Sequence, residues 1–358
     1  MCGYDYLMIG RFQKKDRLSI FSLVPTNFGH VQEKACIRNL TLIARNCMVP
    51  NRHFLPPTRR ALMNIQTVKS NALLLITAAI WGFAFVAQRV GMEYLGPFTF
   101  NAARFALGTL SLLPLLFISR DERPASENIL PRPSLKLVVC GGFAAGFMLF
   151  MGMSLQQVGL VYTTAGKAGF ITSLYVVIVP ILALFWKQST NTGTWIGAVL
   201  AAIGLYFLSV TESLTVEFGD LLEFFCAFFW AGQVLIIGWL SPKIQSVKLA
   251  FTQFVICTAL SLLVAVVVED ISWDALVQAT WPILYGGIFS SGVAFTFQVM
   301  AQRHTHPAHA SIIMSMEAVF AAIGGWLILN EILSMRGLLG CGLMLGGMLF
   351  SQLWGKDR

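Results

Sequence analysis

The chain has 358 residues, of which 56% are hydrophobic and 12% are charged, and its mean hydropathy is +0.70. Soluble domains carry about 25% charged residues, and a soluble domain of this size could not remove so much apolar surface from water. The composition therefore excludes a cytosolic enzyme, a nucleic-acid-binding module and a secreted disulfide-rich domain. Long continuous apolar runs, instead of short alternating segments, also argue against a transmembrane β-barrel.

The net charge of +8 belongs almost wholly to residues 1–62, which hold ten Lys/Arg and three Asp/Glu. This leader has no apolar run near the about 20 residues that span a bilayer, and it lacks a signal-peptide pattern. Two interpretations follow. The leader is a disordered basic cytoplasmic tail, or the start codon is misassigned and translation begins at Met63. The lack of any folded-element pattern favours the second interpretation.

From Ala72 onward, apolar runs alternate with short polar linkers. Each run is near the length of a helix that crosses about 30 Å of hydrocarbon. Lipid offers no partner to a free backbone amide, so the runs must be helices. The predicted fold is all-α integral membrane, with ten transmembrane helices at residues 72–90, 97–118, 137–158, 165–186, 194–210, 220–240, 247–268, 281–301, 308–329 and 336–354.

The Lys/Arg residues of the linkers predict the orientation, because cytoplasmic linkers are enriched in them. With the N-terminus in the cytoplasm, the inner linkers and the C-terminus hold eleven Lys/Arg. The outer linkers hold only Arg89 and Arg336. We therefore expect a multi-pass protein of the cytoplasmic (inner, or plasma) membrane with both termini in the cytoplasm.

The two halves of the chain resemble each other at nearly constant offsets. An offset of 149 aligns Trp81 with Trp230, and an offset of 143 aligns two glycine pairs. An offset of 142 aligns Ser173-Leu174-Tyr175 with Ser315-Met316-Glu317. Each half has five spans, and an odd number inverts the second half relative to the first. The sequence thus predicts two inverted five-helix repeats, residues 63–212 and 213–358, an architecture typical of secondary transporters with a midplane site.

Four segments of the body carry a family resemblance: Ala78–Gly82, Ala102–Phe105, Tyr162–Phe170 and Ser315–Phe320, the last followed by Asn330-Glu331. Through them, residues from about Ala72 to Trp354 resemble the drug/metabolite transporter superfamily, in particular its EamA-type ten-helix members. The resemblance implies inverted repeats around a central cavity and efflux of small metabolites or xenobiotics. Two places depart from the family pattern: Lys187-Gln188 stand where Gly-Glu is expected, and Ala318 stands where a proline is common.

Ionisable side chains at membrane depth are costly, so each is a functional hypothesis. Glu317 lies about ten residues into its span, which is about 15 Å at 1.5 Å per residue. An isolated carboxyl group there is expected to hold its proton, and one that gains and loses a proton as access alternates would couple transport to protons. The alternative is a buried structural acid paired with an arginine or with a helix end. Glu223, in the first turn of its span, is interpreted as structural.

Two cations and several polar side chains complete the candidate set. Arg104 would clamp a carboxylate or phosphate, or else pair with an acid such as Glu317 or reach the outer interface. Lys167, near the outer end of its span, would bind an anion or titrate, or else reach the interface. The predicted substrate-binding residues are Trp81, Arg104, Lys167, Tyr175, Trp230, Gln233, Gln298 and Glu317. The alternative for the tryptophans is helix packing, and for Tyr175 and the two glutamines it is bridging between helices.

The pattern predicts a secondary active transporter that exports a small metabolite or drug-like solute by alternating access, with Glu317 as the candidate proton site. The expected partners are a small-molecule substrate, the lipid bilayer and protons. No cofactor, metal or nucleic acid is predicted. One alternative is a membrane-embedded enzyme, but the chain has neither H-E-x-x-H nor G-x-S-x-G. The other is a channel, which would need a filter or a ring of charges.

Overall fold

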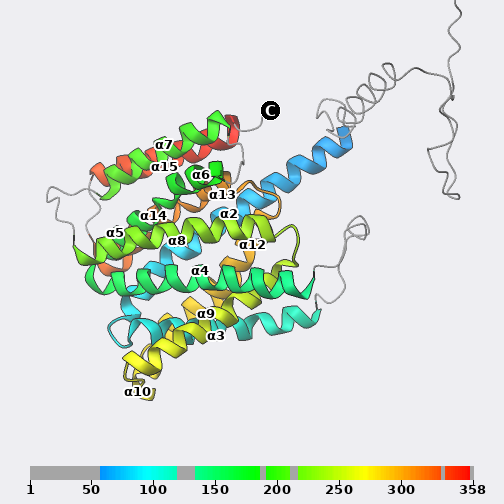
Figure 1. The fold of residues 1–358 in the computed structure, drawn as a ribbon. Coiled ribbons are helices and arrows are strands. Elements are labelled where there is room, and N and C mark those ends of the chain that lie inside the picture. The colour runs from blue at the N-terminus through cyan, green and yellow to red at the C-terminus, as the bar shows by residue number, and fades with distance from the viewer. Residues whose placement is uncertain (1–56, 119–133, 186–190, 210–216, 332–334, 355–358) are drawn as a thin grey trace, which may run out of the picture. The chain divides into compact units, whose positions relative to one another are not determined.

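The computed structural model describes residues 57–118, 134–185, 191–209, 217–331 and 335–354 (Figure 1). The predicted leader, 1–62, lies outside this part of the chain except for the start of the first helix. Residues Leu62–Arg358 form one compact unit, and the arrangement below concerns this unit alone.

The first half of the unit forms six helices in chain order. They are α2 (Pro57–Gly91), α3 (Pro97–Ile118), α4 (Leu135–Tyr162), α5 (Ala165–Thr172), α6 (Tyr175–Phe185) and α7 (Thr192–Ser209). The second half forms α8 (Phe218–Leu240), α9 (Ser246–Val268), α10 (Trp273–Gln278), α11 (Thr280–Leu284), the π-helix η4 (Tyr285–Phe295), α12 (Thr296–Gln302), α13 (Pro307–Met314), α14 (Glu317–Leu329) and α15 (Met335–Trp354). The described residues contain no strand.

The predicted all-α membrane fold is confirmed. Within the described ranges, eight helical spans are long and apolar enough to cross a membrane. The predicted fifth and tenth spans correspond to α7 and α15, which are shorter apolar helices. These two helices pack along each other (Figure 1).

The contacts between helices pair corresponding elements of the two halves. The second helices, α3 and α9, pack together, and so do the fifth helices, α7 and α15. The fourth span of the first half meets the fourth span of the second through α5 and α14. Such self-pairing of equivalent helices is what a pseudo-two-fold axis between inverted repeats produces.

The interface between α7 and α15 shows the inversion directly. A Cβ atom on Gly197 would collide with the carbonyl oxygen of Gly347, and one on Gly204 would collide with that of Gly340. The beginning of each helix therefore meets the end of the other, so the two helices are antiparallel. Small residues let helix backbones approach closely within a membrane, and here they are the glycines that the offset of 143 aligns.

In each repeat the fourth span is broken in the middle. Between α5 and α6 the N–H of Leu174 donates to the carbonyl of Ile171 at 3.1 Å. Between α13 and α14 the N–H of Met316 donates to the carbonyl of Ile313 at 3.2 Å. Both are i→i+3 bonds of a tightened turn, and they recur at the offset of 142. The second break forms although Ala318 replaces the proline common in the family.

The eighth span contains a third irregularity, the π-helix η4. Its carbonyls accept hydrogen bonds from α2: Trp81 Nε1 donates to Ser290 O at 3.2 Å, and Thr77 Oγ1 donates to Ala294 O at 3.2 Å. In the other direction, the Tyr285 hydroxyl donates to Ile80 O at 3.0 Å. Segments of π-helix inside longer helices are frequent at functional sites. This one fixes α2 beside the centre of the unit.

The glycine contacts make a prediction about α15. Gly347→Leu should destabilise the protein by separating α15 from α7, because even a Cβ at this position meets the backbone of Gly197 and Ala201. Gly346→Leu is the matched control, since a Cβ on Gly346 meets nothing within 4 Å. Overpacking of this kind costs about 1–3 kcal/mol or more. Thermal unfolding in detergent should show a lower midpoint for Gly347→Leu alone, and equal midpoints would contradict the close packing.

Candidate functional site

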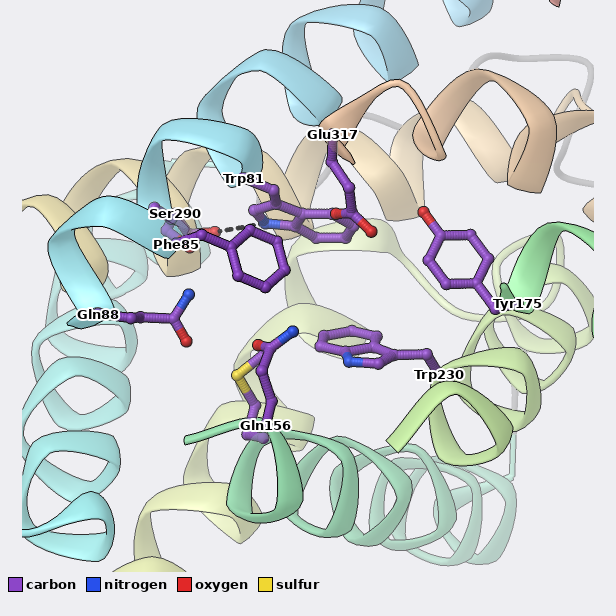
Figure 2. Close-up of a pocket in the computed structure, with 10 residues that line it drawn as sticks. Trp81, Phe85, Gln88, Gln156, Tyr175, Trp230, Ser290 and Glu317 are labelled. Atoms are coloured by element: carbon purple, nitrogen blue, oxygen red, sulfur yellow. Dashed lines mark hydrogen bonds between the residues drawn. The ribbon is translucent and has the colours of Figure 1, made fainter. Parts of the chain in front are cut away.

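A narrow cavity lies where α2, α4, α6, α8, η4 and α14 converge (Figure 2). Its volume is about 20 Å³, which holds a water molecule. Aromatic rings and uncharged polar groups make up most of its wall, together with a single carboxyl group. The lining residues are Trp81, Ala84, Phe85, Gln88, Met153, Gln156, Tyr175, Trp230, Ser290 and Glu317.

Two of these residues stand at the paired helix breaks. Tyr175 is the first residue of α6 and Glu317 is the first residue of α14. Their side chains point toward each other across the cavity (Figure 2). The Ser173 hydroxyl lies 3.4 Å from Glu317 Oε1 and 3.5 Å from the carbonyl oxygen of Ser315. The breaks of the two repeats therefore meet each other at the cavity.

Glu317 is 4% exposed and comes from the helix start that faces the cavity. Among the described residues no cation pairs with it. The predicted alternative, an ion pair with Arg104, is absent from this part of the chain, because Arg104 lies behind Met153, as described below. Glu317 is thus a buried carboxyl group whose neighbours are a serine hydroxyl and a tyrosine.

The two repeat-related tryptophans lie side by side in the cavity wall (Figure 2). Their ring centroids are 5.7 Å apart, and the Phe295 ring lies 4.6 Å from Trp81 and 5.8 Å from Trp230. Trp81 Nε1 is bonded to Ser290 O, whereas the indole nitrogen of Trp230 has no hydrogen-bond partner among the described residues. The wall therefore offers aromatic faces, which bind flat or cationic groups.

Arg104 lies next to the cavity but does not line it. Its side chain, on α3, is 1% exposed, and the guanidinium group sits 4.8 Å from the Phe105 ring centre. Nη2 contacts the sulfur of Met153, a residue that lines the cavity. Nε and Nη1 have no hydrogen-bond partner within the described ranges. Met153 thus separates the predicted anion clamp from the cavity.

Lys167 lies in a second, charged pocket at the end of the helices, which the predicted topology places outside. The pocket has a volume of about 300 Å³ and is lined by Arg89, Val161, Tyr162, Thr163, Thr164, Lys167 and Glu217. Lys167 Nζ forms an ion pair with Asp220 Oδ2 at 2.6 Å. The start of α5 thus places Lys167 near the predicted outer end of its span, at the charged pocket and not in the wall of the central cavity. Its binding of an anion stays a prediction.

Gln233 and Gln298 bind each other instead of facing the cavity. Gln298 Nε2 donates to Gln233 Oε1 at 3.0 Å, and Gln233 Nε2 donates to Gln298 Oε1 at 3.3 Å. Both side chains are fully buried. In a membrane, glutamine side chains on neighbouring helices satisfy each other. Neither glutamine therefore lines the cavity, whereas four of the eight predicted residues do: Trp81, Tyr175, Trp230 and Glu317.

Six lining residues are not among the predicted site residues: Ala84, Phe85, Gln88, Met153, Gln156 and Ser290. One of them had a signal, because the offset of 142 aligns Gln156 with Gln298. Of the two aligned glutamines, Gln156 lines the cavity and Gln298 does not. Glu223, interpreted as a helix-start acid, is fully buried, and the Thr172 hydroxyl donates to its Oε2 at 2.8 Å.

Comparison with known proteins agrees with this architecture. The profile of the EamA-like transporter family matches residues 68–210 and again residues 217–352. An uncharacterized transporter of Archaeoglobus fulgidus is 33% identical over 264 residues, which cover 73% of this chain and 78% of that protein.

More distant relatives extend the likeness. The uncharacterized transporter YoaV of Bacillus subtilis is 24% identical, with 76% of this chain and 94% of YoaV covered. A WAT1-related protein of Arabidopsis thaliana is 24% identical over 83% of this chain and 92% of its own. A protein of known crystal structure shares the fold with a TM-score of 0.63 at 17% identity, covering 80% of this chain and 97% of that one.

The glutamine pair predicts a structural effect that is not additive. Gln298→Met leaves Gln233 Oε1 without a partner, while Gln233 Nε2 keeps its bond to Gln253 Oε1 at 3.4 Å, and an unsatisfied buried polar group costs about 1–3 kcal/mol. Adding Gln233→Met removes that unpaired oxygen, so the double variant should lose less stability than the two single losses together. A double-mutant cycle on thermal unfolding measures this coupling. Additive losses would show that the pair does not hold α8 to α12.

Proposed function

The chain belongs to the EamA-like transporter family, and from that premise we propose that it is a secondary active transporter that exports a small solute by alternating access. The meeting of the two helix breaks at the cavity is the observation that carries the proposal. In secondary transporters built from inverted repeats, discontinuous helices form the substrate site at the repeat interface. Here Tyr175 begins α6, which is the inner half of its span in the predicted topology. Glu317 begins α14, which is the outer half of its span.

The cavity describes a closed conformation. Sites for drug-sized ligands measure about 300–1,000 Å³, whereas this cavity measures about 20 Å³. A solute can therefore bind only after the repeats move apart. The broken turns at Ser173-Leu174 and Ser315-Met316 would absorb that movement, because hinges are short segments at element ends.

Carboxylates of the second repeat hold the predicted outer side shut. Glu331 accepts hydrogen bonds from the first two amides of α5 at 3.2 and 3.3 Å. Glu269 accepts from two amides at the start of α3 at 2.8 and 2.7 Å. Acidic groups are favourable at helix N-termini. Opening the outer side would break these bonds between repeats, so they act as the outer latch of the proposed cycle.

Glu317 is the proposed coupling group. When the cavity opens outward, the carboxylate takes up a proton and the solute leaves. When the cavity opens to the cytoplasm, the proton is released and solute binds again. Among the described residues the carboxyl group has no cationic partner that would hold it charged, so protons and solute compete for it. Aromatic walls with one acid favour a flat solute that is neutral or cationic.

The first test compares cells that overexpress the full chain with cells that overexpress Glu317→Gln. The substitution keeps the shape of the side chain and removes its titrating group. We expect one class of small molecule to be enriched in the medium of the first strain, and enrichment in the second to fall to the level of cells with empty vector. Metabolite profiling of the medium by mass spectrometry provides the measurement.

Asp274→Asn is the matched control, because Asp274 is an exposed acid outside the spans. This variant should export at the wild-type level. Full export by Glu317→Gln under an imposed pH gradient would refute the coupling role. A medium unchanged by the wild-type chain, together with unchanged resistance to a panel of toxic compounds, would refute export.

A further inference from the structure

Glu223 is a buried acid that the proposed transport cycle has not used. Its side chain, on α8, is 0% exposed, and its Oε1 atom has no hydrogen-bond partner among the described residues. The start of α8 is closed by another acid, since Asp220 Oδ2 accepts from the Glu217 N–H at 3.0 Å. Burial of a carboxyl group with an unused oxygen costs free energy. Helix capping therefore does not account for Glu223.

On the predicted outer side, Glu223 follows Asp220, an acid bonded to two residues that line the charged pocket. Asp220 is three residues earlier on α8, and residues three apart share a helix face. Asp220 pairs with Lys167 at 2.6 Å and accepts from the Thr163 hydroxyl at 3.1 Å. Both partners line the charged pocket. One face of α8 thus carries Asp220, which is bonded to the wall of the charged pocket, and Glu223, which is fully buried.

On the cavity side, Glu223 is bonded to the broken fourth span. Thr172 Oγ1 donates to Glu223 Oε2 at 2.8 Å and lies 3.4 Å from the amide nitrogen of Gln156, which lines the cavity. The next residue, Ser173, contacts Glu317. Two adjacent hydroxyl groups at the end of α5 therefore contact the two buried acids, Thr172 contacting Glu223 and Ser173 contacting Glu317.

Glycine provides the space for the carboxyl group. A Cβ atom on Gly159 of α4 would collide with the Glu223 side chain. Among the described residues, the ionisable groups near Glu223 are Asp220 and Cys226 on its own helix and Glu317 across the break. Lys167 lies beyond Asp220, and Tyr175 lies beside Glu317. Within the described part of α4, the residue that meets Glu223 is Gly159, which carries no charge. Glu223 thus lies between two other acids, Asp220 and Glu317, and the cation Lys167 lies beyond Asp220.

We propose that Glu223 is a second proton-binding site, and that protons pass between the charged pocket and Glu317 through Asp220, Glu223 and the Thr172 hydroxyl. The inference rests on the proposed proton coupling and assigns its route. The Asp220 carboxylate takes a proton from water in the charged pocket and passes it to the Glu223 carboxylate. Protonated Glu223 then reverses its hydrogen bond and donates to Thr172 Oγ1. The Thr172 hydroxyl turns its own hydrogen away from Glu223 and releases that proton through a water to the Glu317 carboxylate. Only O–H bonds form and break, and intramembrane acids are typical of such relays.

The test follows protonation of Glu317 without requiring a known solute. The full-length protein is reconstituted in lipid vesicles with a buffered lumen, and the outside is acidified in a stopped-flow infrared instrument. The C=O band of protonated Glu317 is the band that Glu317→Gln removes. In Glu223→Gln we expect this band to rise about a hundredfold more slowly than in the wild type, the lower end of what a positioned acid contributes to proton transfer.

Two further variants separate a relay from a packing effect. Thr172→Val keeps the size of the side chain and leaves Glu223 in place but removes the hydroxyl. The C=O band of Glu317 should then rise as slowly as it does in Glu223→Gln. Thr172→Ser restores the hydroxyl and should restore the rate. Circular dichroism and gel filtration check each fold, and Thr172→Val decides the question if Glu223→Gln does not fold.

The outcomes distinguish this inference from the proposed function. A wild-type rate in both Glu223→Gln and Thr172→Val overturns the relay and leaves coupling through Glu317 intact. A wild-type protein whose Glu317 band does not change with pH overturns the coupling, and the relay with it. Slowing in both variants with rescue by Thr172→Ser supports the route.

Discussion

The structure depends on one constraint: within lipid, every backbone polar group must find its partner inside the protein. Two helices are nevertheless broken in the middle of the bundle. The breaks are tolerated because they face each other, with Ser173 contacting both Ser315 and Glu317. The Ser173 hydroxyl at the break of the first repeat donates a hydrogen bond to the carbonyl oxygen of Ser315 at the break of the second. Buried polar side chains need partners as well, which explains the paired glutamines of α8 and α12, and the indole of Trp81 bonded to a π-helix carbonyl.

The elements that could be predicted were those with a strong periodic or repeated signal. Continuous apolar runs predicted the helices, and the offset of 142 aligned the residues at which both fourth spans break. The glycines at the offset of 143 form the α7–α15 interface, because close helix packing in a membrane requires small residues. Trp81 and Trp230, aligned at mid-span, do meet at one cavity.

The sequence could not predict which face of a helix each polar side chain occupies. Gln156 and Gln298 are equivalent by repeat, yet one lines the cavity and the other binds Gln233. The direction in which each helix turns its glutamine decides between these outcomes. Arg104 illustrates the second difficulty, since the side chain that screens it, Met153, comes from a different helix. Only the packing of α3 against α4 shows this separation.

The latch formed by Glu331 has a consequence for the energy of the two end states. Perfect inverted repeats would make the inward-facing and outward-facing conformations equal in free energy. In this sequence Lys187-Gln188 align with Asn330-Glu331 at the offset of 143, so the first repeat has no acid equivalent to the one that caps α5. In the proposed transport cycle, this difference favours the conformation whose outer side is closed. The resting population would then face the cytoplasm, where the proposed exporter would bind its solute.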